Sequence, residues 1–236
     1  MTSQILYRWP SAARFGRVVP KTKFYEHGKV STAGRDRFVA EIQRITWAYK
    51  LADATIHLRG DNDVPEIQVF EIDAKAADVA DATLAAIDKA VQTPIIFEVR
   101  RTGDGNPQTR MVAAFKQLGS KSPRLAGYLH TDWQPADVER QPLPQALDLA
   151  GLYAALLAPM LPIAPRSGEP LAETTERVER KAKLEREIAS LDRRLRNEPQ
   201  LNRKVELRRQ IQRCEHELAA VLDPNQPTTK DPQWTS

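Results

Sequence analysis

Asp73 and Lys75 form an Asp-x-Lys pattern at the end of a stretch, beginning at Glu66, in which polar and apolar residues alternate. In metal-dependent nucleases such a pattern closes a strand, where carboxylates hold Mg²⁺ and the lysine polarises the attacking water. Asp63 or Asp61, in the turn before the strand, would supply the further carboxylate. A solvated strand end carries the same short pattern in many proteins. A Mg²⁺-dependent endonuclease of the D...(D/E)xK type, with Asp63, Asp73 and Lys75 as catalytic residues, is therefore an alternative hypothesis and not the main one.

Other candidate metal ligands have weaker patterns. Glu71 shares a face of the same predicted strand with Asp73 and could replace it, although a cross-strand ion pair explains a glutamate there as well. The four histidines are far apart in the sequence and lack ligand spacing, so we predict no zinc site. We predict no cofactor, and only the nuclease alternative requires Mg²⁺.

The elements that must position these residues can be predicted from periodicity. Alternation from residue 66 to 73 predicts a half-buried strand, and residues 55–59 predict a second strand, joined to it by a turn at residues 60–63. Upstream, Ser31 or Thr32 can cap a helix. Its apolar stripe, spaced at helical intervals, comprises Phe38, Ile42, Ile45 and Tyr49.

Downstream, residues 79–91 favour a helix and the apolar run 94–99 favours an interior strand, which together predict a crossover to a parallel neighbour. Two further strands are expected at 110–118 and 125–131, and a helix at 148–161. Residues 1–161 are thus predicted to form an α+β or α/β body, with a mixed sheet of about five strands, flanking helices and an extended basic N-terminal arm.

The composition changes after residue 161. Residues 162–171 form a proline-rich linker, and residues 223–236 have the composition of a disordered tail. Between them, apolar residues recur every three or four positions on both sides of Pro199, which predicts an antiparallel coiled-coil helical hairpin over residues 172–222. Its seam comprises Leu184, Ile188, Leu191, Leu195, Leu207, Ile211, Cys214, Leu218 and Val221. A kinked helix that pairs with another chain, and so causes oligomerisation, is the alternative.

Charge is distributed unevenly along the 236 residues, whose formal net charge is +4. Five basic residues and no acidic one precede Glu26. A second cluster surrounds the predicted hairpin tip, where it would suit contacts to nucleic-acid phosphates, although charged flanks of a coiled coil look the same. The candidate nucleic-acid-binding residues are Arg193, Arg194, Arg196, Arg203, Lys204, Arg208 and Arg209.

The single cysteine, Cys214, excludes an intramolecular disulfide, and its place on the seam indicates a small buried residue. No apolar run approaches the length needed to span a membrane. We therefore expect a cytoplasmic protein without a membrane partner.

Four motifs resemble those of a bacterial family known only as a domain of unknown function, and the similarity spans nearly the whole chain. They are Pro20-Lys21-x-Lys23-Phe24-Tyr25, Ile45-Thr46-Trp47, Thr131-Asp132-Trp133 and the run from Gln200 to Leu207. Members of that family are found beside DNA methyltransferase and helicase genes of restriction-modification or phage-defence systems. The resemblance implies partners of that kind and no particular activity or catalytic residues.

The main hypothesis is therefore an accessory or adaptor subunit of such a system. Its body would dock on a protein partner, a DNA methyltransferase or helicase, and its basic hairpin would contact a partner helix or the DNA backbone. The alternatives are the Mg²⁺-dependent endonuclease and a structural dimer held by the tail.

Overall fold

The alternating stretch around Asp73 is the third strand, β3 (Ile67–Ala74), of a mixed sheet in the computed structural model. The structure describes residues 4–27, 30–103, 105–118 and 124–225. The chain divides into two compact units, Met1–Met160 and Leu161–Ser236. The first unit is α+β, and the second contains two long helices.

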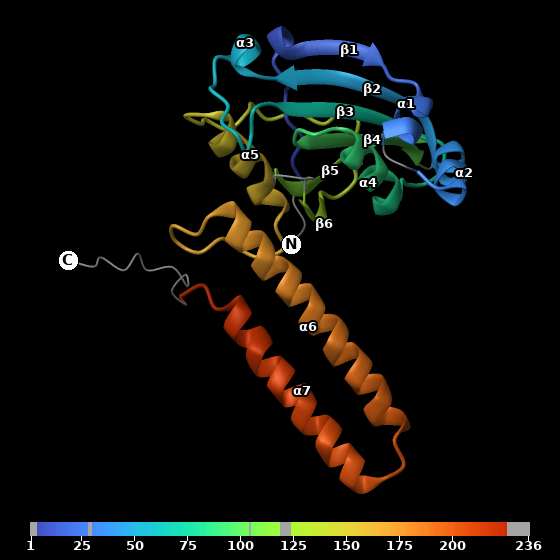
Figure 1. Ribbon diagram of the computed structural model, residues 1–236, viewed down its shortest axis with the longest axis vertical. Coiled ribbons are helices and arrows are strands. Elements are labelled where there is room, and N and C mark those ends of the chain that lie inside the picture. Colours follow the sequence, from blue (N-terminus) through green and yellow to red (C-terminus); the bar gives the residue numbers. More distant parts are fainter. Residues whose placement is uncertain (1–3, 28–29, 104, 119–123, 226–236) are drawn as a thin grey trace, which may run out of the picture. The chain divides into compact units, whose positions relative to one another are not determined.

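One seven-stranded sheet forms from the described residues of the first unit, in the order β1-β2-β3-β4-β5-β6, with β7 paired to β5 (Figure 1). Only β3 and β4 are parallel among these pairs, so the predicted mixed sheet is confirmed, with more strands than expected. The other strands are β1 (Arg14–Val18), β2 (Ile42–Leu51), β4 (Ile95–Gly103), β5 (Asn106–Gln117), β6 (Arg124–His130) and β7 (Gln134–Pro135). Residues 14–18 join the sheet edge instead of lying over it as an arm.

Helix α4 (Asp81–Ala90) connects the parallel strands β3 and β4, as the sequence predicts. It packs with α1 (Lys21–His27) and α2 (Thr32–Glu41) over one sheet face, where the core includes Phe24, Phe38, Phe70, Leu84 and Phe97. The opposite face is buried along β3 too, since Ile67 and Val69 are fully covered. β3 is therefore an interior strand and not the half-buried one that its alternation predicts. The described part of the body contains one more α-helix of at least two turns, α5 (Leu149–Leu157).

The helix predicted to run from residue 31 to 49 ends at Glu41, and its second half is strand β2. Two irregularities in the β2–β3 register, between Ile42 and Arg44 and between Trp47 and Tyr49, explain the error. Each shift interrupts the two-residue alternation, so buried residues recur every third position along β2 and imitate a helical stripe.

The strand predicted at residues 55–59 does not form, and α3 (Asp53–Ile56) takes its place. The Thr55 hydroxyl accepts a hydrogen bond from the Ala52 amide at 3.0 Å and donates one to the Lys50 carbonyl at 2.8 Å. These bonds favour a helical turn over a strand. The antiparallel neighbour of β3 is consequently β2 and not a short strand just upstream.

In the second unit, α6 (Leu171–Asn197) and α7 (Leu201–Leu222) lie side by side as a hairpin, which confirms the predicted hairpin (Figure 1). The predicted seam is the core of this unit: Leu184, Leu191, Leu207, Ile211 and Cys214 are buried. Residues 226–236 of the predicted tail lie outside the described residues. No helix in the described part is long and apolar enough to cross a membrane.

The buried side chain of Lys116 links the crossover between β3 and β4 to the sheet. The Lys116 ammonium on β5 lies 2.7 Å from Asp88 Oδ1 and donates hydrogen bonds to the carbonyls of Asp88, Val91 and Thr93 at 2.8–2.9 Å. The Tyr128 hydroxyl donates to the other Asp88 oxygen at 2.5 Å. Burial lowers the pKa of Lys116 and raises that of Asp88, while their mutual attraction opposes both shifts.

Replacing Lys116 should therefore destabilise the body strongly. We expect Lys116→Met to lower the free energy of unfolding by about 3–5 kcal/mol, because it leaves Asp88 as a buried charge without its cation and three carbonyls without a donor. Urea denaturation followed by circular dichroism measures this. Lys89→Met, an exposed neighbour on α4, is the control and should change the value by no more than about 0.5 kcal/mol. Equal effects of the two substitutions would contradict the structural role of Lys116.

Candidate functional site

Asp73 and Lys75 lie at the carboxyl end of β3, where both have intramolecular partners. The Asp73 carboxylate forms an ion pair with Arg44 on β2 at 2.7 Å. The Lys75 ammonium donates to the carbonyl of Val39 in the last turn of α2 at 2.8 Å. Each charge is thus held against a neighbouring element, although Asp73 and Lys75 both remain partly exposed.

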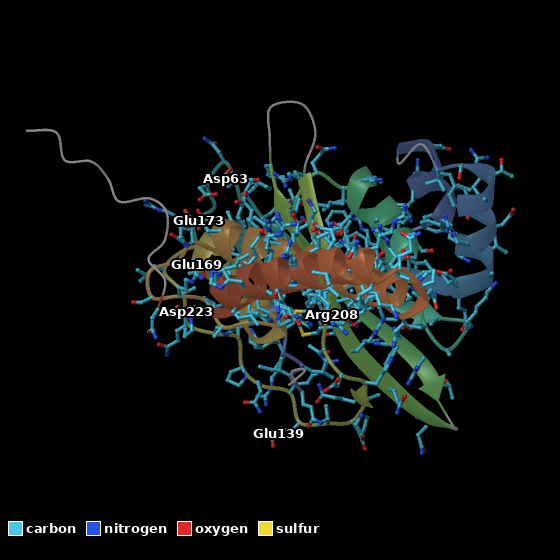
Figure 2. The ribbon with its side chains drawn as sticks, turned by 90° about the horizontal axis from the view of Figure 1, so that it is seen from below. Asp63, Glu139, Glu169, Glu173, Arg208 and Asp223 are labelled. Atoms are coloured by element: carbon cyan, nitrogen blue, oxygen red, sulfur yellow. The ribbon has the colours of Figure 1, made fainter. Side chains whose placement is uncertain are left out.

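Asp63 does not join them. It lies exposed on the loop before β3 (Figure 2), where its amide donates to Asp61 Oδ1 at 2.9 Å. The strand segment from Ile67 to Asp73 spans roughly 20 Å and runs away from that loop. The described residues contain no group of three or more His, Cys, Asp or Glu side chains that could hold a metal ion. The structure therefore brings Asp73 and Lys75 together without Asp63.

Two further carboxylates lie beside Asp73, one on β3 and one on β4. Glu71 pairs with Arg100 at 2.5 Å, which matches the cross-strand ion pair considered for it. Glu98 is fully buried, yet the Arg140 guanidinium binds both of its oxygens, at 2.7 and 2.9 Å. Trp9 Nε1 also donates to it at 2.5 Å.

These hydrogen bonds to Glu98 raise the pKa of Arg140. Arg140 also donates to the carbonyl of Tyr7 at 2.8 Å, so the cluster ties the N-terminal segment to the sheet. Its role is structural, and it was missed because its members are far apart in the sequence.

An open depression of about 860 Å³ lies at the carboxyl ends of β3 and β4, beside Lys75. Its charged lining residues are Lys75 and Arg101. Three alanines, Ala74, Ala76 and Ala77, also line it, and their small side chains keep the depression open. Arg101 lies 3.9 Å from the centre of the Trp133 ring. Two cations without an acidic lining residue suit an anion, and the ends of parallel strands are a common place for ligands.

Hydrogen bonds hold Arg101 in place: it donates to Gln108 Oε1 at 2.9 Å and to the carbonyl of Ala77 at 2.7 Å. Lys21 lies near this pair, because burial and then the charge of Lys75 lower the pKa of Lys21. Arg101 and Trp133 were not predicted as a pair, since 32 residues separate them in the sequence.

Ion pairs and hydrogen bonds concentrate at the base of the hairpin, where the chain enters α6 and leaves α7. Arg177, which is buried, binds both carboxylate oxygens of Glu169 at 2.8 Å and donates to the Val221 carbonyl at 2.9 Å. Arg166 donates to the carbonyls of Ala220 and Asp223 at 3.0 Å. Two arginines thus cap the carboxyl end of α7, the negative end of its dipole. Glu169 and Asp223 mark this base in Figure 2.

The opposite end of the hairpin, at the α6–α7 loop, carries the predicted basic cluster; we call it the basic tip. Within the described part of the chain, none of its seven cationic side chains forms a hydrogen bond or an ion pair, and all except the half-buried Lys204 are exposed. They are Arg193, Arg194, Arg196, Arg203, Lys204, Arg208 (Figure 2) and Arg209. The hairpin therefore presents unpaired positive charge at one end.

Two features of α7 make this charge unusual for a solvated helix. Arg203 and Lys204 lie in its first turn, which contains no acidic residue, so two cations face the positive end of the helix dipole. Leu201 and Val205 on the same helix are 73% and 39% exposed. The tip thus combines cations that repel one another with two exposed aliphatic side chains.

Comparison with known proteins identifies one match. The model of a family described as "Domain of unknown function (DUF4391)" matches residues 8–218, which include the body and most of the hairpin. No curated protein and no solved structure matches the chain.

The base of the hairpin should control its stability. We expect Arg177→Met to increase the hydrogen exchange of amides 215–222 in α7, equivalent to a loss of about 2–4 kcal/mol in local stability, because Glu169 and the Val221 carbonyl lose their donor. Mass spectrometry of exchanged peptides measures this in the full chain. Arg180→Met removes an exposed ion pair to Glu217 and should cost at most about 1 kcal/mol. Equal protection in both variants would show that Arg177 does not hold the helix end.

Proposed function

We propose that this chain, a member of the DUF4391 family of domains of unknown function, is an accessory or adaptor subunit of a bacterial restriction-modification or phage-defence system. In this role the basic tip binds the DNA backbone, and the protein associates with a DNA methyltransferase or helicase partner. The resemblance of its sequence motifs supports the partner class. The observation that carries the DNA-binding part is the basic tip itself, with seven cationic side chains that have no partner within the described chain.

The physical basis is phosphate neutralisation. Cations that already have carboxylate partners lose those pairs when they bind a phosphate, whereas the cations of the tip lose only hydration. The amino end of α7 adds free amides and the positive end of a dipole at the same place. No hydrogen bond or ion pair within the described chain fixes the direction of these side chains toward a base edge, so we expect backbone contacts that are strong at low salt and insensitive to sequence.

The shaft of the hairpin differs from its tip. There, Lys181 pairs with Glu185 at 2.7 Å and Arg180 pairs with Glu217, so part of the positive charge is neutralised within the hairpin. The exposed Leu201 and Val205 next to the tip give a protein partner an apolar contact that a duplex does not need.

The tip therefore predicts a particular salt dependence. The full chain should bind two unrelated 20-base-pair duplexes with equal affinity. Arg193→Gln/Arg196→Gln should reduce the slope of log Kobs against log[salt] by about 2 and weaken binding roughly tenfold at about 0.1 M salt, because two phosphate contacts are lost. Fluorescence anisotropy over a salt series measures both quantities.

Lys183→Gln/Arg186→Gln is the matched control, since these two residues have the same spacing on the shaft of α6 and are also exposed. It should leave the slope unchanged. Equal slopes for all three proteins, or no binding by the full chain at about 0.05 M salt, would rule out the tip as a DNA-binding surface.

The endonuclease is a second candidate because of one observation, the depression that Lys75 and Arg101 line beside Asp73. In this hypothesis Asp73, with Glu71 in place of Asp63, would exchange the ion pairs to Arg44 and Arg100 for Mg²⁺, and Lys75 would polarise the water. Cleavage of duplex DNA or RNA should then require Mg²⁺ or Mn²⁺ and fall at least 100-fold in Asp73→Asn and Lys75→Ala. No cleavage by the full chain, or cleavage that survives both substitutions, would remove this candidate.

A further inference from the structure

A cavity of about 310 Å³ lies between the sheet and its helical layer, away from the carboxyl ends of β3 and β4. Three aromatic rings form its walls: Phe24 from α1, Trp47 from β2 and Phe70 from β3. Trp47 and Phe70 are nearly parallel, with ring centres 6.0 Å apart and planes at 13°. We call it the aromatic cavity. Its volume is near the lower limit for ligand pockets, so it fits one small ring system and not an extended chain.

Two buried polar atoms on residues of this cavity have no hydrogen-bond partner among the described residues: Trp47 Nε1 and Gln68 Oε1. Gln68 is 1% exposed. Its amide orientation is set by Nε2, which donates to Glu66 Oε1 at 2.6 Å, so the free atom is the acceptor oxygen. One buried donor and one buried acceptor are thus left unmatched. Such groups destabilise a fold unless something binds them.

The sheet register places these two groups on one face. Trp47 lies opposite Phe70 across the β2–β3 pair, and Gln68 precedes Phe70 by two residues. Trp47 and Gln68 are therefore diagonal neighbours on one face of the sheet. Glu66 adds no free charge, because Lys50 pairs with it.

We infer that the aromatic cavity binds a flat heteroaromatic ring with a hydrogen-bond donor and an acceptor on its edge, the chemistry of a nucleobase. The ring would pack against the aromatic walls. Neighbouring atoms cover both polar atoms, so Trp47 and Gln68 would turn toward the ring, the indole Nε1 donating to a ring nitrogen or carbonyl and Gln68 Oε1 accepting from an imino or amino group. A purely apolar ligand leaves both polar atoms unmatched. Lys23 lines the cavity and is exposed, which suits a phosphate attached to the base.

The base can come from a free nucleotide or from a nucleic acid whose base is turned out of its stack. Both sources present the same edge to Trp47 and Gln68. The inference does not depend on the basic tip, which belongs to the other compact unit.

The test uses the full chain and four probes, adenosine, guanosine, cytidine and uridine, with binding measured by saturation-transfer NMR and calorimetry. At least one nucleoside should bind with a dissociation constant below about 1 mM. Gln68→Leu and Trp47→Phe should each weaken it about tenfold, since each removes one hydrogen bond. Gln212→Leu, an exposed position on α7, is the matched control and should leave binding unchanged. Arg193→Gln/Arg196→Gln should leave it unchanged too, whether or not the tip binds DNA.

Gln68→Leu should change the melting temperature little, because the lost hydrogen bond from Nε2 to Glu66 is offset by removal of a buried oxygen without a partner. If Gln68→Leu does unfold the chain, nucleoside binding by Trp47→Phe alone tests the inference. Competition by a single-stranded oligonucleotide but not by its abasic counterpart assigns the base to nucleic acid, and competition by mononucleotides alone assigns it to a free nucleotide. The inference is overturned if no nucleoside binds, or if binding is the same in every folded variant of Trp47 and Gln68.

Discussion

The body depends on one buried ammonium group. Lys116 reaches from β5 to the end of α4, where it binds Asp88 and three carbonyls that would otherwise have no donor. A parallel strand pair needs a long crossover, and its return point must be fixed before the second strand can enter in register. Lys116 fixes that point, since Thr93 directly precedes the Pro94 that leads into β4. The ion pair carries a desolvation cost, and the hydrogen bonds to the carbonyls offset it.

The contacts of Lys116 also bear on the two hollows of the body. The segment that Lys116 holds, Val91 to Thr93, also lines the aromatic cavity, so the anchor and the cavity share the same backbone. At the other end of the parallel strands, the chain leaves β3 through the short alanine-rich segment that lines the depression. A change in the β3–β4 register would therefore alter both hollows together. The register is one constraint that shapes both hollows.

Periodicity was enough to predict the elements with regular repeats. The hairpin seam and α4 follow from apolar residues at helical intervals, whereas β3 follows from an alternating stretch and β4 from a continuous apolar run. β2 was misread because its register shifts give buried residues a spacing of three, and α3 because Thr55 bonds to its own backbone. The sites were harder to predict. Glu98 finds Arg140 and Trp9 at separations of 42 and 89 residues, and no local pattern reveals such pairs.

The energetic cost of an unpaired polar group depends on whether the group is buried. An exposed arginine without a partner costs the fold little, because water solvates it, so a single unpaired cation indicates nothing. The basic tip is informative through concentration: seven cations lie close together at one end of the hairpin, and two of them oppose the dipole of α7. A buried amide oxygen without a donor is different, since the folded chain loses hydration there and gains no bond in return. Gln68 persists in a strand interior where leucine would fit the pattern. A partner that enters the cavity accounts for both Gln68 and Trp47, whereas packing alone accounts for neither polar atom.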